Sequence, residues 1–176
     1  MRGHGPADKR SIDPLSTGKN IIVSLTRQRL VLHEDGRELR SYAVSTSRYG
    51  PGERQDSQCT PRGLHRVRAR IGQGLERGAV LVGRRPTGEV HDAALAARFP
   101  GRDWILTRIL WLCGCEPGRN RLGQVDSMRR FVYIHGTPDA EVMGVPFSHG
   151  CIRMSNDDVL DLFDRVNVGT LVDIQA

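Results

Sequence analysis

The strongest constraint on the fold is a set of three short apolar segments in the N-terminal half, each separated from the next by a tight polar turn. The apolar side chains fall in residues 21–25, 29–33 and 37–45. The turn before the third segment contains Asp35-Gly36, a pair that readily takes the positive φ angles of a short hairpin. Segments of this length are typical of strands, so the sequence predicts a β-meander that begins near Asn20.

The rest of the chain continues in short strands and contains one segment of clear helical character. We expect further strands at 64–71, 103–113, 130–135 and 170–174. Ser155 followed by acidic residues is typical of a helix N-terminus, and apolar residues then recur at helical spacing, namely Val159, Leu160, Phe163 and Val166. The sequence therefore predicts a mainly β fold with one short helix.

Two regions do not fit this pattern. Residues 1–19 are polar and contain several Gly and Pro, which predicts a flexible arm before a single domain over 20–176. Residues 72–101 contain a candidate strand at 79–82 and a candidate short helix at 93–99, but Gly and Arg interrupt the region. We therefore expect residues 72–101 to leave the sheet.

The composition favours one soluble domain. With 176 residues, 38% of them hydrophobic, the chain can bury a core without disulfides or a structural metal, and four Cys are too few for a disulfide scaffold. No apolar run approaches the roughly 20 residues that cross a bilayer, and the first twenty residues lack the apolar segment of a secretory signal. Basic side chains outnumber acidic ones by 17 to 8 in residues 1–88, which suits an anionic partner. An aromatic content of 5% argues against a nucleic-acid stacking surface.

A segment near the C-terminus concentrates residues that support nucleophilic chemistry. Two histidines, His135 and His149, lie within 16 residues of Cys151, and a neighbouring imidazole or cation lowers the pKa of a thiol. We therefore expect a thiolate at neutral pH. His135 ends an apolar strand and suits a general base, whereas His149 is too close in sequence to reach the sulfur easily. Gly150 lets amide N–H groups approach a substrate carbonyl, and Arg153 suits a substrate carboxylate.

These residues resemble the catalytic domain of bacterial L,D-transpeptidases, also called the ErfK/YbiS/YcfS/YnhG or YkuD-type domain. The resemblance rests on His135, a gap, and then Ser148-His149-Gly150-Cys151-Ile152-Arg153. It extends to the opening meander, to Val44-Ser45-Thr46, and to Thr60-Pro61-Arg62-Gly63, which is similar to the Thr-Pro-x-Gly element of the family. It covers about residues 20–174 and implies a β-sandwich or barrel-like domain with one short helix after the cysteine motif.

The resemblance also implies roles for the residues of the motif. Cys151 is the implied nucleophile and His135 the implied base, oriented by the backbone carbonyl of Gly136. The acyl site would be lined by Ser148, His149, Gly150 and Arg153, with backbone donors from Gly150 and Cys151. No metal or organic cofactor is required, because thiol, imidazole and backbone amides supply the chemistry.

The implied reaction is peptidoglycan crosslinking. Cys151 attacks the diaminopimelate carbonyl of a tetrapeptide stem, expels the terminal D-alanine, and forms a thioester that an amine of a second stem resolves into a 3-3 crosslink. A free D-amino acid, a protein lysine or water are alternative acceptors, and water makes the site an L,D-carboxypeptidase. Carbapenems are the expected inhibitors. We expect a monomer in the periplasm or cell envelope, although a cytoplasmic location stays open without a visible signal.

Other interpretations of the sequence also stay open. They are a hydrolase of peptide or lipoprotein links, a non-catalytic module that binds an anionic polymer, and a toxin or processing enzyme exported by an unusual route. The spacing of Cys113 and Cys115 argues against a zinc site and favours small core or loop residues. The roles of His65 and Cys59 are undecided, and residues 72–120 are a candidate lid or acceptor-side wall.

Overall fold

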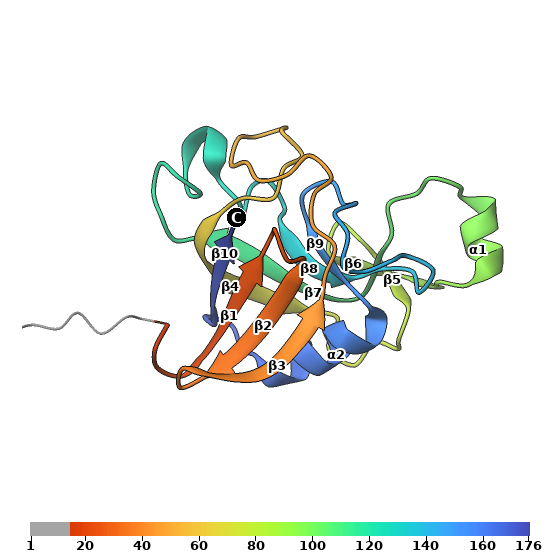
Figure 1. The fold of residues 1–176 in the computed structure, drawn as a ribbon. Helices are drawn as coiled ribbons and strands as arrows, with labels where there is room; N and C mark the ends of the chain where they lie inside the picture. Colours follow the sequence, from red (N-terminus) through yellow and green to blue (C-terminus); the bar gives the residue numbers. More distant parts are fainter. Residues whose placement is uncertain (1–14) are drawn as a thin grey trace, which may run out of the picture.

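The computed structural model describes residues 15–176, so most of the arm predicted over 1–19 lies outside the described residues. The described residues form one ten-stranded sheet and two α-helices (Figure 1). In chain order the elements are β1 (Lys19–Ser24), β2 (Arg29–Glu34), β3 (Arg37–Ala43), β4 (Gly63–Ile71), β5 (Ala79–Val82), β6 (Arg85–Val90), α1 (Ala93–Arg98), β7 (Ile105–Gly114), the 3-10 turn η1 (Gly123–Val125), β8 (Tyr133–Gly136), β9 (Ile152–Met154), α2 (Asn156–Arg165) and β10 (Leu171–Gln175).

The predicted β-meander is confirmed. β1, β2 and β3 lie side by side and antiparallel, with Ile21 opposite Leu32 and Leu30 opposite Tyr42. The turn between β2 and β3 uses Asp35-Gly36 with φ angles of +50° and +76°, as the hairpin signal predicts. Alternate residues of these strands are fully buried, which fixes the face that the meander turns to the core.

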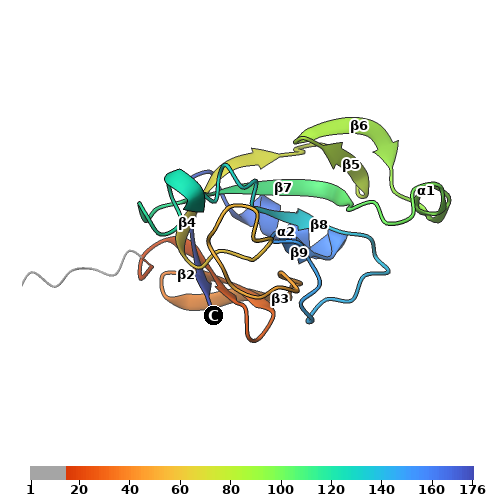
Figure 2. The ribbon, with the colours of Figure 1, turned by 90° about the horizontal axis from the view of Figure 1, so that it is seen from above.

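The sheet continues from β1 through β10, β4, β7, β5 and β6, and β8 with β9 branch from β7. β7 is buried along almost its whole length, as expected of a central strand covered on both faces. The sheet bends so that its two halves face each other, and Figure 2 shows α2 between β2–β3 and β7–β8. Side chains from both halves and from α2 form one core cluster, which includes Leu30, Leu110 and Phe163.

The helix after the cysteine motif begins and packs largely as predicted. The Ser155 hydroxyl accepts the Asp158 N–H and caps the helix. Val159, Leu162 and Phe163 are its buried apolar residues, each contributing about 1.5–3 kcal/mol of transfer free energy. Leu160 is half-buried at the edge of this face, and the fully buried Leu162 is the residue that the predicted spacing leaves out.

The expectation that residues 72–101 leave the sheet is wrong for the hairpin β5–β6. β5 pairs with both β6 and β7, and its first three residues are buried against the sheet. The candidate helix at 93–99 is present as α1, with Asp92 accepting the Leu95 N–H as its cap and no buried residue of its own. Figure 1 places α1 at the end of the molecule away from the meander.

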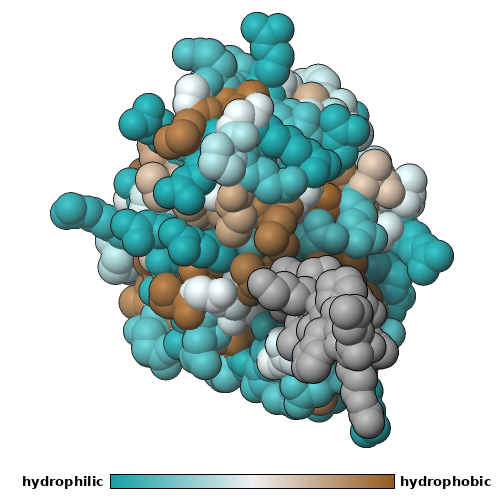
Figure 3. All heavy atoms as spheres, turned by 90° about the vertical axis from the view of Figure 1, so that its left-hand side faces the viewer, coloured by the Kyte–Doolittle hydropathy of each residue, from teal (hydrophilic) through white to brown (hydrophobic). Residues whose placement is uncertain are grey.

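The face seen in Figure 3 is mostly hydrophilic, with small separate hydrophobic areas among the teal side chains. Within residues 15–176, no helix combines the length and the apolar character that a membrane crossing requires.

Candidate active site

Two short parallel strands bring the predicted catalytic residues together. β8 and β9 pair in parallel with Ile134 beside Ile152 and His135 beside Arg153, so Cys151 lies just before β9 and next to Tyr133. Ile134 and Ile152 point into the core cluster. Because side chains alternate along a strand, Tyr133, His135, Cys151 and Arg153 share the opposite face.

His135 is held rigidly at the end of β8. The ring is 2% exposed, and its Nδ1 lies 2.7 Å from the carbonyl oxygen of Gly136, the contact that the sequence analysis expects. A carbonyl only accepts, so Nδ1 carries the proton and Nε2 is left as the acceptor of the neutral ring. Burial lowers the pKa of His135, which keeps the imidazole neutral. The ring therefore has the tautomer and charge that a general base requires.

Cys151 meets two backbone groups of the neighbouring chain segment. Its Sγ accepts the N–H of Tyr133 at 3.4 Å and donates to the carbonyl oxygen of Phe131 at 3.4 Å. Burial raises the pKa of the Cys151 thiol to about 11, and the charge of Asp103 acts in the same direction. The Tyr133 N–H and the charge of Arg153 lower the pKa but do not overcome burial. The expectation of a thiolate at neutral pH is therefore wrong for the resting site, which holds a neutral thiol.

The loop before Cys151 is fixed by two segments that the family resemblance also covers. The Thr60 hydroxyl, fully buried, donates to the carbonyl of Gly150 at 3.0 Å and accepts the N–H of Ser47 at 3.0 Å. The carbonyl of Thr46 accepts the N–H of Ser148 at 2.9 Å. The 60–63 and 44–46 elements thus hold the cysteine loop in place, although they lie about ninety or more residues away in sequence.

Ser148 and Gly150 shape this loop. Ser148 Oγ donates to the carbonyl of Cys151 at 2.6 Å and accepts the N–H of Gly150 at 3.2 Å, so the hydroxyl is committed within the loop. Gly150 has φ +125°, a conformation that L side chains rarely adopt. Since the Gly150 N–H already has this partner, the amide that contacts the sulfur is that of Tyr133. Sequence reasoning missed Tyr133 because a backbone donor leaves no signature in residue type.

Arg153 is already neutralised by carboxylates. Its side chain is 4% exposed, with Nη2 2.7 Å from Asp103 and Nη1 3.0 Å from Glu141. His149 lies 3.4 Å from the second oxygen of Asp103. For Arg153 to bind a substrate carboxylate as the sequence analysis expects, it would have to give up one of these two partners.

Beside the thiol lies a small pocket of about 160 Å³. It is lined by Gln55, Asp56, Gln58, Arg130, Phe131, Val132, His149, Gly150 and Cys151. Gln55, Asp56 and Gln58 thus form one wall of this pocket, and none of its lining residues comes from the 72–120 region. Of that region, 105–114 is the central strand β7, and Asp103 is the part that contacts His149 and Arg153.

The other candidate residues lie outside this arrangement. His65 is a fully buried strand residue, with Nε2 2.8 Å from the Ser127 hydroxyl and Nδ1 2.9 Å from the Gly63 carbonyl. All four cysteines are free, Cys113 buried and Cys59 and Cys115 partly exposed. Cys59 Sγ contacts the carbonyls of Tyr49 and Ser57.

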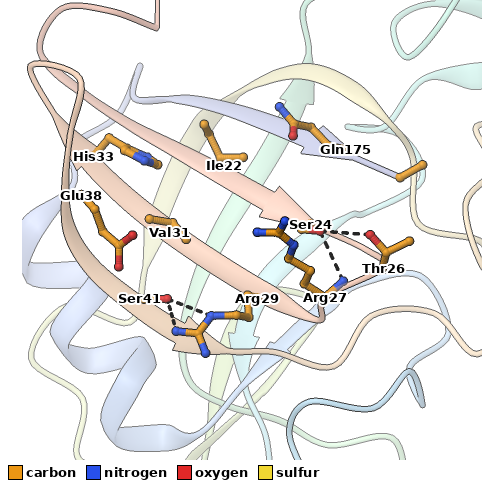
Figure 4. Close-up of a pocket in the computed structure, with 11 residues that line it drawn as sticks. Ile22, Ser24, Thr26, Arg27, Arg29, Val31, His33, Glu38, Ser41 and Gln175 are labelled. Atoms are coloured by element: carbon orange, nitrogen blue, oxygen red, sulfur yellow. Dashed lines mark hydrogen bonds between the residues drawn. The ribbon is translucent and has the colours of Figure 1, made fainter.

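A separate hollow of about 510 Å³ lies on the outer face of the meander (Figure 4). Figure 4 shows Ile22, Val31 and the polar side chains of Arg29, His33 and Ser41 facing it. Neither Cys151 nor His135 lines this hollow.

A thiol, a neutral imidazole and a backbone N–H donor thus lie together on two paired strands of a bent β-sheet. In a comparison with known proteins, residues 18–174 match the model of the YkuD family, described as the L,D-transpeptidase catalytic domain. The chain belongs to this family.

Individual relatives match only part of the chain or share its fold. Over 45 residues it is 51% identical to the probable L,D-transpeptidase ErfK/SrfK of Salmonella typhimurium, covering 26% of this chain and 15% of the relative. Over 43 residues it is 51% identical to the putative L,D-transpeptidase YqjB of Bacillus subtilis, covering 24% of each.

Solved structures share the fold over most of this chain. An L,D-transpeptidase from Mycobacterium smegmatis aligns with a TM-score of 0.57 and 20% identity, over 90% of this chain and 59% of that one. The L,D-transpeptidase LdtMt1, solved in complex with imipenem, aligns with a TM-score of 0.53 and 20% identity, over 89% of this chain and 58% of that one. The chain thus spans less than two thirds of these relatives.

Proposed function

We propose that this domain is an L,D-transpeptidase that crosslinks peptidoglycan stems through Cys151. The observation that carries the proposal is the face that β8 and β9 share. On it, Cys151 lies two residues before Arg153, which is paired with His135, and the neutral His135 ring is hydrogen-bonded to the Gly136 carbonyl. Membership of the L,D-transpeptidase family supports the choice of substrate. Such stems lie outside the cytoplasm, so we place the working protein in the cell envelope.

The first half-reaction forms a thioester. His135 Nε2 takes the proton of the Cys151 thiol as sulfur attacks the carbonyl of the third-position diaminopimelate residue. The tetrahedral intermediate then collapses, the C–N bond to the terminal D-alanine breaks, and His135 returns the proton to the leaving amine. The Tyr133 N–H, 3.4 Å from the sulfur, suits stabilisation of the carbonyl oxygen in the intermediate.

The second half-reaction frees the enzyme. An amine of a second stem attacks the thioester carbonyl and loses a proton to His135, the C–S bond breaks, and the thiol recovers that proton. The proton that His135 takes from the thiol in the first half-reaction leaves with D-alanine, and the proton taken from the acceptor amine restores the thiol, so both groups end the cycle neutral. Water in place of the amine gives carboxypeptidase activity, and the product therefore distinguishes the two outcomes.

The test begins with the intact mass of the protein after incubation with imipenem, the ligand of the similar LdtMt1. We expect one adduct on wild type and on Cys59→Ala, and none on Cys151→Ala or His135→Gln. Tetrapeptide with a D-amino acid acceptor should then give the exchanged peptide by mass spectrometry. Tripeptide alone would favour the hydrolase, and a folded protein with neither adduct nor product would favour the non-catalytic module.

A further inference from the structure

Three arginines lie near Cys151, and they differ in their hydrogen-bond and ion-pair partners. Arg153 is paired with Asp103 and Glu141. Arg130 lines the pocket, but its terminal nitrogens donate to four acceptors of the neighbouring loop, namely the carbonyls of Gly52, Glu53 and Cys59 and the hydroxyl of Ser57. Both guanidinium groups are occupied by the fold itself, so neither is free to receive a second anion without losing a partner.

Arg84, at the turn of the β5–β6 hairpin, is held differently. Its guanidinium carbon lies 4.5 Å from the ring centre of Trp111 and 4.9 Å from that of Phe131. Nη1 donates to the hydroxyl of Tyr133 at 2.9 Å. Within residues 15–176 this is the one hydrogen bond of the side chain, and no carboxylate lies within 4.0 Å of it. A guanidinium stacked on aromatic rings is fixed in orientation while its remaining donors stay available.

The rings beneath Arg84 belong to the thiol site. Phe131 and Tyr133 supply the two backbone groups that contact Cys151 Sγ. Trp111, Tyr133 and Cys151 pack in the same apolar cluster. Phe131 is half-exposed and also lines the pocket beside the thiol. The Arg84 guanidinium therefore contacts the side chains of the same two residues, Phe131 and Tyr133, whose backbone groups contact the sulfur.

We propose that Arg84 is a specificity-determining residue that binds a carboxylate of the peptide substrate through paired N–H donors. The inference rests on the proposed function, since the tetrapeptide stem carries carboxylates on diaminopimelate and on the terminal D-alanine. Arg84 takes the role that sequence analysis gives to Arg153, because its charge has no anionic partner among the described residues. Planar guanidinium and carboxylate groups pair well in this geometry.

The test measures binding, so that it does not depend on turnover. Titration calorimetry would compare Cys151→Ala with the double variants that add Arg84→Met or Arg85→Met. Met keeps the stem packed on the rings and removes the charge. Arg85 is exposed and its side chain makes no hydrogen bond or ion pair within residues 15–176, which makes it the matched control. The ligands are the tetrapeptide and versions in which each of its carboxylates in turn is amidated.

We expect Arg84→Met to weaken tetrapeptide binding by roughly tenfold to a hundredfold, and Arg85→Met to leave it nearly unchanged. Amidating the recognised carboxylate should weaken binding to Cys151→Ala by a similar factor. It should not weaken binding to the double variant with Arg84→Met any further, and the amidated peptide that shows this pattern identifies the carboxylate. An equal loss on Arg84→Met for every peptide tested, no loss for any of them, or no peptide binding at all would overturn the inference. If peptide binding depends on Arg84 and one carboxylate as described, but the imipenem and product assays both fail, the result counts against the proposed function and not against this inference.

Discussion

The neutral thiol of Cys151 leads to a sharp prediction about its pH dependence. With the pKa raised to about 11, roughly one Cys151 in ten thousand is ionised at pH 7, about a hundredfold fewer than for an unperturbed thiol. Iodoacetamide reacts with the thiolate, so the alkylation rate of Cys151 should rise about tenfold per pH unit from pH 7 to 10. The same cysteine in urea-unfolded protein should react faster at pH 7 and level off above about pH 9.

The rate is measured by mass spectrometry of the peptide that contains Cys151, which separates it from the other three cysteines. Asp103→Asn should move the profile to lower pH, because the Asp103 charge raises the pKa of the thiol. A profile that is flat between pH 6 and 9 in folded wild type would refute the reasoning, since it would require a preformed thiolate–imidazolium pair.

Three further changes test the packing around the site. Burial lowers the pKa of His65 to about 4, so the unfolded chain takes up a proton at higher pH than the folded one. The free energy of unfolding from urea titrations should therefore fall by about 3 kcal/mol between pH 7 and 4, and His65→Gln should remove this dependence. Thr60→Val should cost about 2–4 kcal/mol in the same assay by leaving the Ser47 N–H and Gly150 carbonyl unpaired, while Thr60→Ser should restore most of it. Gly136→Ala should lower the calorimetric Tm, because a Cβ there lies 2.6 Å from the Leu106 carbonyl oxygen, and an unchanged Tm would contradict this contact.

The parts of the fold with local signals could be predicted from the sequence. The Asp35-Gly36 turn and the Ser155 cap each involve residues a few positions apart, and both form as expected. The pairing of β5 with β7 could not be predicted, because it joins Val80 to Leu106 and depends on the bend of the whole sheet. Propensity carries no information about which distant strand a short apolar run will meet.

The candidate site divides in the same way. The motif predicts the neighbourhood of His135 and Cys151, and the structure brings their strands together. Three features could not be predicted from residue type. Burial raises the pKa of the Cys151 thiol, Asp103 forms an ion pair with Arg153, and the Arg84 guanidinium lies over the Phe131 ring. Each of these depends on a partner at least eighteen positions away, brought close only by the fold.

The charges around the sulfur also indicate how a substrate carbonyl should lie. Arg153 is matched by both Asp103 and Glu141, so this side of the thiol carries a net negative charge. The sulfur also contacts the Tyr133 N–H, and the Arg130 guanidinium, which lines the pocket beside the thiol, is bonded only to neutral acceptors. Negative charge that develops on the carbonyl oxygen is stabilised near N–H donors and destabilised near carboxylates. The oxygen of the intermediate should therefore point toward Tyr133, and the Asp103 side is left for the neutral part of the peptide.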